Sequence, residues 1–210
     1  MKLFGYNSNP YPTILANPFQ SMIYWDDMTI LTLGPNGSLS HEALLILSPH
    51  KKVSFATSIN ELFFRLADKE IVEGVIPIEI GEIFIEDTVS HLMKYDFVVT
   101  RKVTFPIQGS DELFATFFAI GKKGFKKKKE SGSAFLIFSE PMATLGKQIA
   151  NQARKLKIPL LKLKNLLLQE GETPVYFMEV EGHIEEHPVR TFFEFLSDKY
   201  LIKHLGSYPL

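Results

Sequence analysis

Two hydroxyl side chains, Ser38 and Ser40, follow a glycine turn in the stretch MTILTLGPNGSLSHEALLIL. The apolar, β-branched run before the turn predicts a strand. The residues after it predict a helix that begins near His41 and is capped by Ser40. The backbone N–H groups of a tight turn and of the first turn of a helix have no partner within those elements. We therefore expect Gly37, Ser38 and Ser40 to bind an anion.

Two further side chains that could do chemistry lie in apolar segments, Glu79 in EGVIPIEI and Thr116 in ELFATFFAIGKK. EGVIPIEI is too apolar to alternate, which is typical of a strand buried on both faces in a parallel sheet. The carboxyl group of Glu79 could be a buried general acid or a carboxylate hydrogen-bonded at a strand end. The hydroxyl of Thr116 could donate a proton, although a hydroxyl on an apolar strand more often bonds to the backbone.

The first half of the chain predicts an α/β unit that positions these residues. Strands are predicted before the glycine turn, at KVSFAT and at EGVIPIEI, and a helix is predicted after Ser58, which forms a capping box with Glu61. In such a β-α-β-α-β order, ligands bind at the carboxyl ends of the strands, where the glycine turn and residues 77–81 lie. A helix over EDTVSHLMKYD, capped by Asp87 or Thr88, follows, and then strands over FVVTRKVTF and ELFATFFAIGKK.

The run GKKGFKKKKESGS is rich in glycine and lysine and predicts a linker between two domains. After it, strands are predicted at AFLIF, PLLKLKNLLLQ, TPVYFMEVEG and LIKHLGSYP, and helices at MATLGKQIANQARKLK and HPVRTFFEFLSDKY. Two β-α-β halves of this kind predict a ferredoxin-like sandwich with both helices on one face of an antiparallel sheet. The other face must be covered, which usually means a second subunit. The expected organisation is an irregular arm over 1–27, an α/β domain over 28–122, a linker over 123–132 and a ferredoxin-like domain over 133–210.

The composition limits the classes of partner. The chain has 210 residues, of which 45% are hydrophobic, so it can bury a core. Its net charge of -1 gives no general attraction to nucleic acid or to acidic membranes, so we expect a small molecule or a second copy as the partner. Without cysteine, the chain has no disulfide and no thiolate nucleophile. No apolar run approaches the roughly 20 residues of a membrane span, and the N-terminus lacks a signal-peptide pattern. We therefore expect a cytoplasmic protein.

Two histidines have a spacing that is found in metal sites. His183 and His187 are separated as helical metal ligands are, at positions i and i+4. However, Pro188 and the preceding strand put both histidines at a junction between a strand and a helix, where His187 caps or begins the helix. We therefore expect no metal site there.

Three motifs, in the same order, make the chain resemble prephenate dehydratase. GPNGSLSHEA is similar to the family's opening glycine turn, GVIPIEI resembles its Val-Pro-Ile-Glu-Asn-Ser strand, and EGHIEE with LGSYP matches the end of its ACT regulatory domain. The resemblance implies a periplasmic-binding-protein-like α/β lobe followed by an ACT domain. It also implies an enzyme of phenylalanine biosynthesis that converts prephenate to phenylpyruvate, water and carbon dioxide without a metal or another cofactor. The ACT domain of such an enzyme senses phenylalanine and helps to form dimers or tetramers.

The chain departs from the family in its catalytic half. Most of the second α/β lobe is missing, because the chain passes at GSD from the start of that lobe to the strand that returns to the first. Where the family carries Thr-Arg-Phe, this chain offers Ala115, Thr116 and Phe117, or Thr116 and then Phe117 when the alignment slides by one. The Arg that would clamp a carboxylate is lost either way. The expected catalytic residues are Thr116 and Glu79. The expected substrate-binding residues are Gly37, Ser38 and Ser40.

The ACT-like region also departs from the family, at its phenylalanine site. The family uses Gly-Ala-Leu at the first helix and Glu-Ser-Arg-Pro after the second strand. This chain has Met142, Ala143 and Thr144 at the helix and Asn165 after the strand, and these residues form the expected regulatory site in altered form. Two functions stay open. The first is a compact prephenate dehydratase with a degenerate active site, and the second is a non-catalytic ACT-type ligand-sensing or regulatory partner of another enzyme.

Overall fold

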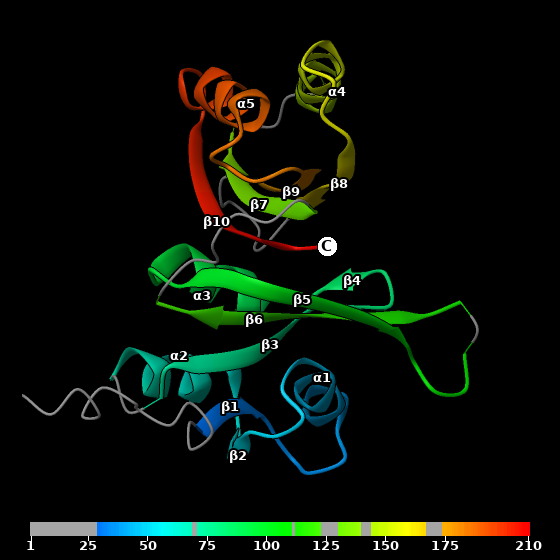
Figure 1. Cartoon of the computed structure of the whole chain (residues 1–210), viewed down its shortest axis with the longest axis vertical. Coiled ribbons are helices and arrows are strands. Elements are labelled where there is room, and N and C mark those ends of the chain that lie inside the picture. Colours follow the sequence, from blue (N-terminus) through cyan, green and yellow to red (C-terminus); the bar gives the residue numbers. More distant parts are fainter. Residues whose placement is uncertain (1–28, 69–70, 111, 123–129, 140–143, 167–173) are drawn as a thin grey trace, which may run out of the picture.

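Two β-sheets stacked face to face form the centre of the molecule (Figure 1). The computed structural model describes residues 29–68, 71–110, 112–122, 130–139, 144–166 and 174–210. The first sheet has the strand order β2-β1-β3-β6-β5, with β4 beside β3, and the second has the order β10-β7-β9-β8. The arrangement confirms the predicted α/β class with a ferredoxin-like second part.

The first sheet is mixed. Its strands are β1 (Thr29–Leu33), β2 (Lys52–Ala56), β3 (Glu73–Ile80), β4 (Ile83–Phe84), β5 (Val98–Pro106) and β6 (Phe114–Gly121). Strand β1 is parallel to β2 and β3, whereas β6 is antiparallel to both β3 and β5. The apolar segment EGVIPIEI forms β3 and is buried along its length, as predicted. The parallel pairing expected for it holds only on its β1 side, because β6 returns beside it in the opposite direction.

The helices of this half are α1 (Leu39–Leu47), α2 (Ile59–Ala67) and α3 (Glu86–Lys94). Helix α1 packs Ala43 and Leu44 on one face of the sheet, and it lies on the side far from the second sheet (Figure 1). Helices α2 and α3 pack on the opposite face, in a core cluster that they share with the second sheet. The first sheet is therefore covered on both faces.

The helix caps test the sequence predictions directly. Ser58 caps α2 as predicted, because its Oγ accepts the Glu61 N–H at 3.1 Å. Helix α1 begins at Leu39 and its cap is Ser38, so the predicted start near His41 and the predicted cap Ser40 are wrong. The prediction for α3 is also wrong, since its N-cap position is Ile85 and no side chain caps it. The predicted caps Asp87 and Thr88 lie inside that helix.

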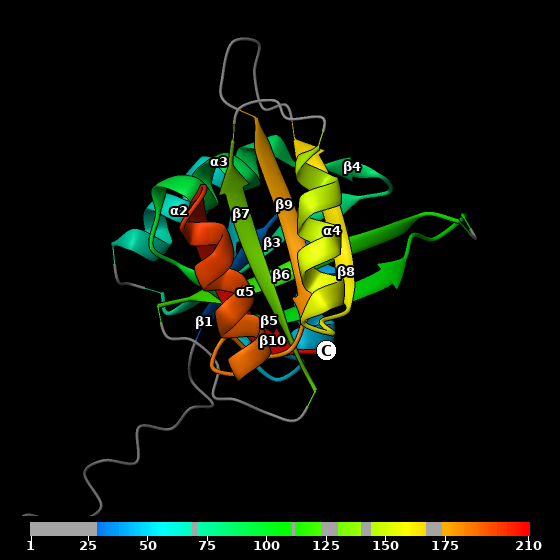
Figure 2. The same ribbon diagram turned by 90° about the horizontal axis from the view of Figure 1, so that it is seen from above.

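The second sheet is fully antiparallel and carries both of its helices on one face (Figure 2). Its elements are β7 (Ser131–Phe138), α4 (Leu145–Lys155), β8 (Leu160–Leu166), β9 (Val175–Glu181), α5 (His187–Ser197) and β10 (Leu201–Pro209). This is the predicted βαββαβ order. Strand β7 begins at Ser131, inside the stretch 123–132 that was expected as a linker, and residues 123–129 of that stretch lie outside the described residues.

The other face of the second sheet packs on the first sheet of the same chain. Leu136 and Phe177 from the second sheet share a core cluster with Ile76 and Phe118 from the first. The sequence pattern predicts a second subunit on this face, but the first sheet covers it because the chain folds back on itself. Strand β10 also runs against β5, where Gly206 has a φ of +145° and a Cβ atom would lie 2.4 Å from the Val99 carbonyl oxygen. Only glycine allows so close an approach of two backbones.

A largely buried cluster of hydroxyl and imidazole groups lies at the β7–β10 side of the second sheet. Ser207 Oγ lies 2.7 Å from Ser133 Oγ and 3.2 Å from His204 Nε2. Burial lowers the pKa of His204 to about 4, with the nearby His183 acting in the same direction and the backbone of Gly206 in the opposite one. His204 is therefore neutral in the folded protein at pH 7.

This histidine makes stability depend on pH. The unfolded chain binds a proton at His204 below its ordinary pKa of 6.5, whereas the folded protein binds it only near pH 4. Stability is therefore complete above pH 6.5 and falls as the pH drops, by about 2 kcal/mol between pH 7 and pH 4.5. Urea denaturation of the wild type and of His204→Gln at both pH values isolates this contribution, and equal pH dependence in the two proteins would contradict it.

Candidate active site

Glu79 and Thr116 lie opposite each other on neighbouring strands. They are register partners of β3 and β6, and Thr104 of β5 is the register partner of Thr116 on its other side. The hydroxyl oxygens of Thr104 and Thr116 are 3.1 Å apart and share a hydrogen bond. Glu79 is 7% exposed and Thr116 is 9% exposed, so both side chains are held within the protein. The structure thus brings the two expected catalytic residues together and adds Thr104.

A β-bulge turns Glu79 toward these threonines. The register between β3 and β6 shifts between Pro77 and Glu79, which leaves Ile78 as the extra residue. In a regular strand, Glu79 would share a face with Pro77 and would point toward α1. Because of the bulge, Ile78 and Glu79 both line the space between the two sheets. Pro77 has no N–H to donate to a sheet ladder, which is typical of a bulged position.

The two sheets enclose a cleft of about 530 Å³ at this point. Its lining residues are Glu79, Gly81, Glu82, Thr104, Glu112, Phe114, Thr116, Lys162 and Lys164. The two lysines come from β8 of the second sheet, and the Lys162 ammonium group forms a salt bridge with the Glu79 carboxylate. Glu79 is thus a carboxylate in an ion pair, which agrees with the second of the two alternatives considered for it.

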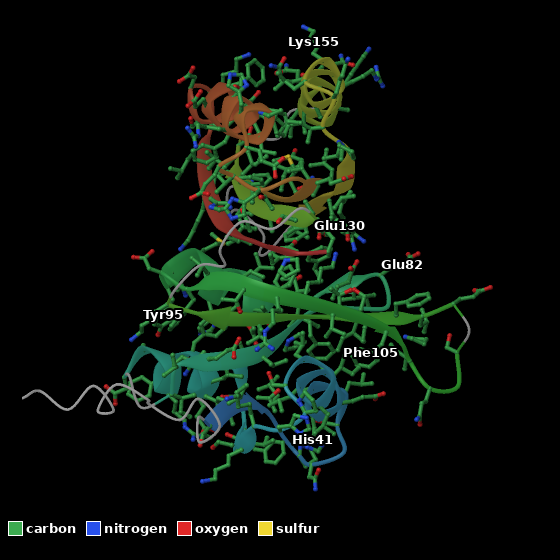
Figure 3. The ribbon with its side chains drawn as sticks, in the orientation of Figure 1. His41, Glu82, Tyr95, Phe105, Glu130 and Lys155 are labelled. Carbon is green, nitrogen blue, oxygen red and sulfur yellow. The ribbon has the colours of Figure 1, made fainter. Side chains whose placement is uncertain are left out.

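The second sheet contributes to this cleft in a way that sequence reasoning missed. In LLKLKNL of β8, Lys162 and Lys164 alternate with leucines, and this alternation was the available signal that one face of the strand is polar. The side chain of Lys164 donates to the carbonyl oxygen of Glu82 at 2.7 Å. Figure 3 shows Glu82 on the part of the first sheet that faces the second sheet. The position of β8 over the strand end of β3 depends on how the sheets stack, which local patterns do not show.

The glycine turn lies apart from the cleft. Gly37, Ser38 and Ser40 do not line it, and His41 of the same helix lies on the opposite side of the first sheet from Glu82 (Figure 3). Two N–H groups of the turn already have partners. The Gly37 N–H donates to His41 Nδ1, and the Ser38 N–H donates to the Pro35 carbonyl oxygen, both at 3.1 Å.

The two serines of the turn have different surroundings. The Ser38 hydroxyl accepts the His41 N–H and donates to the Leu33 carbonyl oxygen, both at 3.3 Å, so it closes the start of α1. Ser40 is buried, and its carbonyl oxygen accepts the hydroxyl of Thr32 at 3.2 Å. The turn is therefore tied to its own helix and strand.

Replacing Ser38 with alanine is expected to lower the free energy of unfolding by about 1 kcal/mol, because the start of α1 loses its side-chain cap. Urea denaturation followed by circular dichroism measures this change. Ser38→Thr serves as the control, since threonine keeps the capping hydroxyl and should retain most of the stability. An alanine variant as stable as the wild type would show that the hydrogen bond to the His41 N–H contributes nothing.

The expected regulatory residues are described only in part. Met142 and Ala143 lie outside the described residues. Thr144 is exposed at the start of α4, and its hydroxyl accepts the side-chain amide of Gln148 at 3.4 Å. Asn165 is exposed on β8, close to the end of that strand. A regulatory ligand at these residues therefore stays a prediction.

The spacing of the two histidines does not correspond to one helix. Helix α5 begins at His187, with Pro188 in its first turn, and His183 lies before the helix. The Nδ1 atom of His183 accepts the Glu185 N–H at 3.2 Å. Within the described ranges, no group of three or more histidine, aspartate or glutamate side chains is arranged to hold a metal ion.

A second ion pair joins the sheets beside the cleft. The ammonium group of Lys102 on β5 lies 2.7 and 2.8 Å from the two carboxylate oxygens of Glu179 on β9. The Tyr208 hydroxyl donates to the same carboxylate at 2.8 Å. Burial raises the pKa of Tyr208, and the charge of Glu179 adds to the shift. The two ion pairs have opposite polarity, since the first sheet supplies the carboxylate of one and the ammonium group of the other.

Comparisons with known proteins match a family model to residues 30–110 and a known fold to most of the chain. Residues 30–110 match the family model of prephenate dehydratase, and no curated protein matches the chain. The structure of prephenate dehydratase from Streptococcus mutans is similar at a TM-score of 0.71 and 22% identity, over 87% of this chain and 98% of that one. A prephenate dehydratase from Arthrobacter aurescens, solved in complex with L-Phe, has a TM-score of 0.70 and 12% identity, over 87% of this chain and 90% of that one.

A protein with a different activity shares this fold. GqqA, described as a novel type of quorum quenching acylase, has a TM-score of 0.74 and 14% identity, over 89% of this chain and 96% of that one. At such identities, structural likeness shows the fold alone, so the reaction must be argued from the cleft. No helix in the described part of the chain has the length and apolar character that are needed to cross a membrane.

Proposed function

This chain is a prephenate dehydratase-like protein, and from that premise we propose that it converts prephenate to phenylpyruvate, water and carbon dioxide in the cleft between its two sheets. One observation carries the proposal. Glu79 and the hydrogen-bonded pair of Thr104 and Thr116 face the same cleft from three adjacent strands. Its volume of about 530 Å³ lies in the range of small-molecule sites.

The chemistry needs a group that helps a hydroxyl group leave the ring. Thr104 can donate its proton to Thr116 Oγ1, which leaves the Thr116 hydroxyl free to donate to the departing oxygen. The Glu79 carboxylate can accept a hydrogen bond from the same ring hydroxyl and so orient it. As the bond between the ring and this oxygen breaks, the hydroxyl takes the proton of Thr116 and leaves as water. The bond between the ring and its carboxylate group breaks at the same time, carbon dioxide is released, and the electron pair of that bond completes the aromatic ring. Thr116 then regains a proton from the solvent.

The non-catalytic alternative is supported by a different observation. None of the chain's arginines lines the cleft: Arg65 and Arg101 bond to groups of the first half, and Arg154 and Arg190 lie on α4 and α5. The family's carboxylate clamp therefore has no arginine here. A protein that binds a ligand without turnover, and that senses it or regulates another enzyme, would fit such a site.

A phenylalanine effector and self-association also belong to the proposal. The prephenate dehydratase from Arthrobacter aurescens was solved with L-Phe bound, which supports phenylalanine as an effector of a related fold. Met142, Ala143, Thr144 and Asn165 are the proposed contacts. Thermal denaturation with L-Phe and with D-Phe tests the effector, because a specific site should raise Tm only with the L-isomer.

We further propose that the protein is a homodimer or homotetramer in the cytoplasm. Gly37, Ser38 and Ser40 stay a predicted anion-binding turn.

The test of the reaction is a direct assay. Prephenate is incubated with the protein at neutral pH, and phenylpyruvate is measured by its absorbance in alkali. A parallel sample without protein accounts for spontaneous breakdown. Turnover above that control, and its loss in Glu79→Gln, would support the enzyme. A folded wild type that is no faster than the control would overturn the enzyme and favour the ligand-sensing alternative.

A further inference from the structure

We propose that Lys162 and Lys164 bind the carboxylate groups of the substrate, so that the second sheet supplies the cationic half of the cleft. The identity of the ligand rests on the proposed function, since prephenate is a dicarboxylate. The position of the lysines does not rest on it. Both side chains line the cleft together with Thr104 and Thr116 of the first sheet.

Contacts with residues of the first sheet hold the two ammonium groups in place. Lys162 Nζ is paired with the Glu79 carboxylate and lies 5.2 Å from the centre of the Phe84 ring. Lys164 Nζ donates to the Glu82 carbonyl oxygen at 2.7 Å and lies 5.9 Å from the centre of the same ring. The ring face attracts both cations. Their flexible stems are thus anchored before any ligand arrives, which lowers the entropy that binding would cost.

Both lysines have further N–H donors that can bind a ligand. An ammonium group carries three N–H donors. Lys162 directs one toward Glu79 and Lys164 directs one toward the Glu82 carbonyl oxygen. The remaining N–H groups can reach the oxygens of a bound carboxylate without breaking these contacts. A ligand can therefore be added to the ion pair between Lys162 and Glu79 and does not have to compete with it.

Among the charged side chains that line the cleft, the lysines are less exposed than Glu82 and Glu112, which favours an anion beside them. Glu82 and Glu112 are exposed, so water screens their charges. The charges of Glu79 and Lys162 offset each other, and the ammonium group of Lys164, which is only partly exposed, remains. The two lysines are the only cations among the lining residues that the structure describes. An ammonium group acts as a point charge and lacks the two parallel donors of arginine, so we expect weaker recognition than an arginine clamp would give.

The test separates substrate binding from chemistry by steady-state kinetics. In Lys164→Met, KM for prephenate is expected to rise about 10-fold while kcat changes little, because one charged hydrogen bond is lost. In the double variant Lys162→Met/Lys164→Met, KM should rise about 100-fold. Lys155→Met on α4 is the matched control, since Lys155 lies at the far end of the molecule from the cleft (Figure 3). Lys162→Arg keeps the charge beside Glu79, so its KM should rise less than that of Lys162→Met.

Failure of this inference can be told apart from failure of the proposed function. If the wild type is active and the double variant keeps its KM, the lysines do not bind substrate and the inference is overturned. If the wild type shows no turnover, calorimetric titration with prephenate decides. Binding that the folded double variant loses would support the lysines although the reaction is absent. A wild type that does not bind prephenate would overturn both.

Discussion

Replacing Thr116 with valine is expected to lower kcat for prephenate by about 1,000-fold, within the range that proton transfer by a positioned side chain contributes. Valine keeps the shape of threonine but removes the hydroxyl that faces Glu79 and bonds to Thr104. The departing oxygen of the substrate then has no donor on β6. Stopped assays of phenylpyruvate over long incubations measure so slow a rate, with circular dichroism to show that the variant is folded.

Two other threonine variants make this result specific. Thr104→Val is expected to cost about 10-fold in kcat, because Thr104 only orients the hydroxyl of Thr116. Thr100→Val, on the same strand β5, removes a hydroxyl that bonds to Glu73 and to the Ala119 carbonyl oxygen, outside the cleft. It should leave kcat within a factor of about two, as a residue without contact to the reacting groups does. A Thr116→Val enzyme with unchanged kcat would remove Thr116 from the mechanism.

Replacing Lys102 with methionine is expected to lower the free energy of unfolding by about 3 to 4 kcal/mol, because it leaves a buried carboxylate without its counter-charge. The Glu179 side chain is 3% exposed, and its oxygens lie 2.7 and 2.8 Å from the Lys102 ammonium group. In the variant, the hydroxyl of Tyr208 is the remaining partner among the contacts described for this carboxylate. Urea denaturation at pH 7 measures the loss.

A second substitution distinguishes the unpaired charge from lost packing. In Lys102→Met/Glu179→Gln the buried group is neutral and can still accept the Tyr208 hydroxyl, so the double variant should be more stable than Lys102→Met alone. A double variant as unstable as the sum of the two single variants would contradict this explanation. It would then be the packing of the lysine stem that stabilises the contact between the sheets.

The elements that the sequence predicted correctly carry strong local signals. EGVIPIEI forms β3 between the predicted residues, because an unbroken apolar run of this length has few alternatives to a buried strand. The capping box of Ser58 and Glu61 gives the start of α2, since it satisfies backbone groups within one turn. The order of strands and helices after the lysine run predicts the second sheet correctly, because the strand and helix patterns of each β-α-β half can be recognised within that half.

The site could be predicted only in part, because its halves come from distant segments. Lys162 and Glu79 are separated by 83 positions in the sequence and meet only when the two sheets stack. The bulge that turns Glu79 toward Thr116 depends on the pairing of β3 with β6, which the pattern of β3 alone does not contain. Thr104 lies on an alternating strand, and its role follows from its register partner.

The cap of α1 was mispredicted for a local reason. Ser38 and Ser40 are both good cap residues, and the sequence does not say which hydroxyl reaches a free N–H group. In the structure, the Ser38 hydroxyl accepts the His41 N–H, while Ser40 is buried inside the first turn. A choice between two similar residues two positions apart depends on backbone geometry, and pattern reading does not resolve it.

The most direct test of the central claim, that prephenate binds in the cleft between the sheets, is a crystal structure of Thr116→Val soaked with prephenate at mildly alkaline pH. We predict density for the ring beside Glu79 and Thr104, with the carboxylate groups near Lys162 and Lys164. Density at the glycine turn of Gly37 and Ser38, with an empty cleft, would contradict the account and move the site to the start of α1.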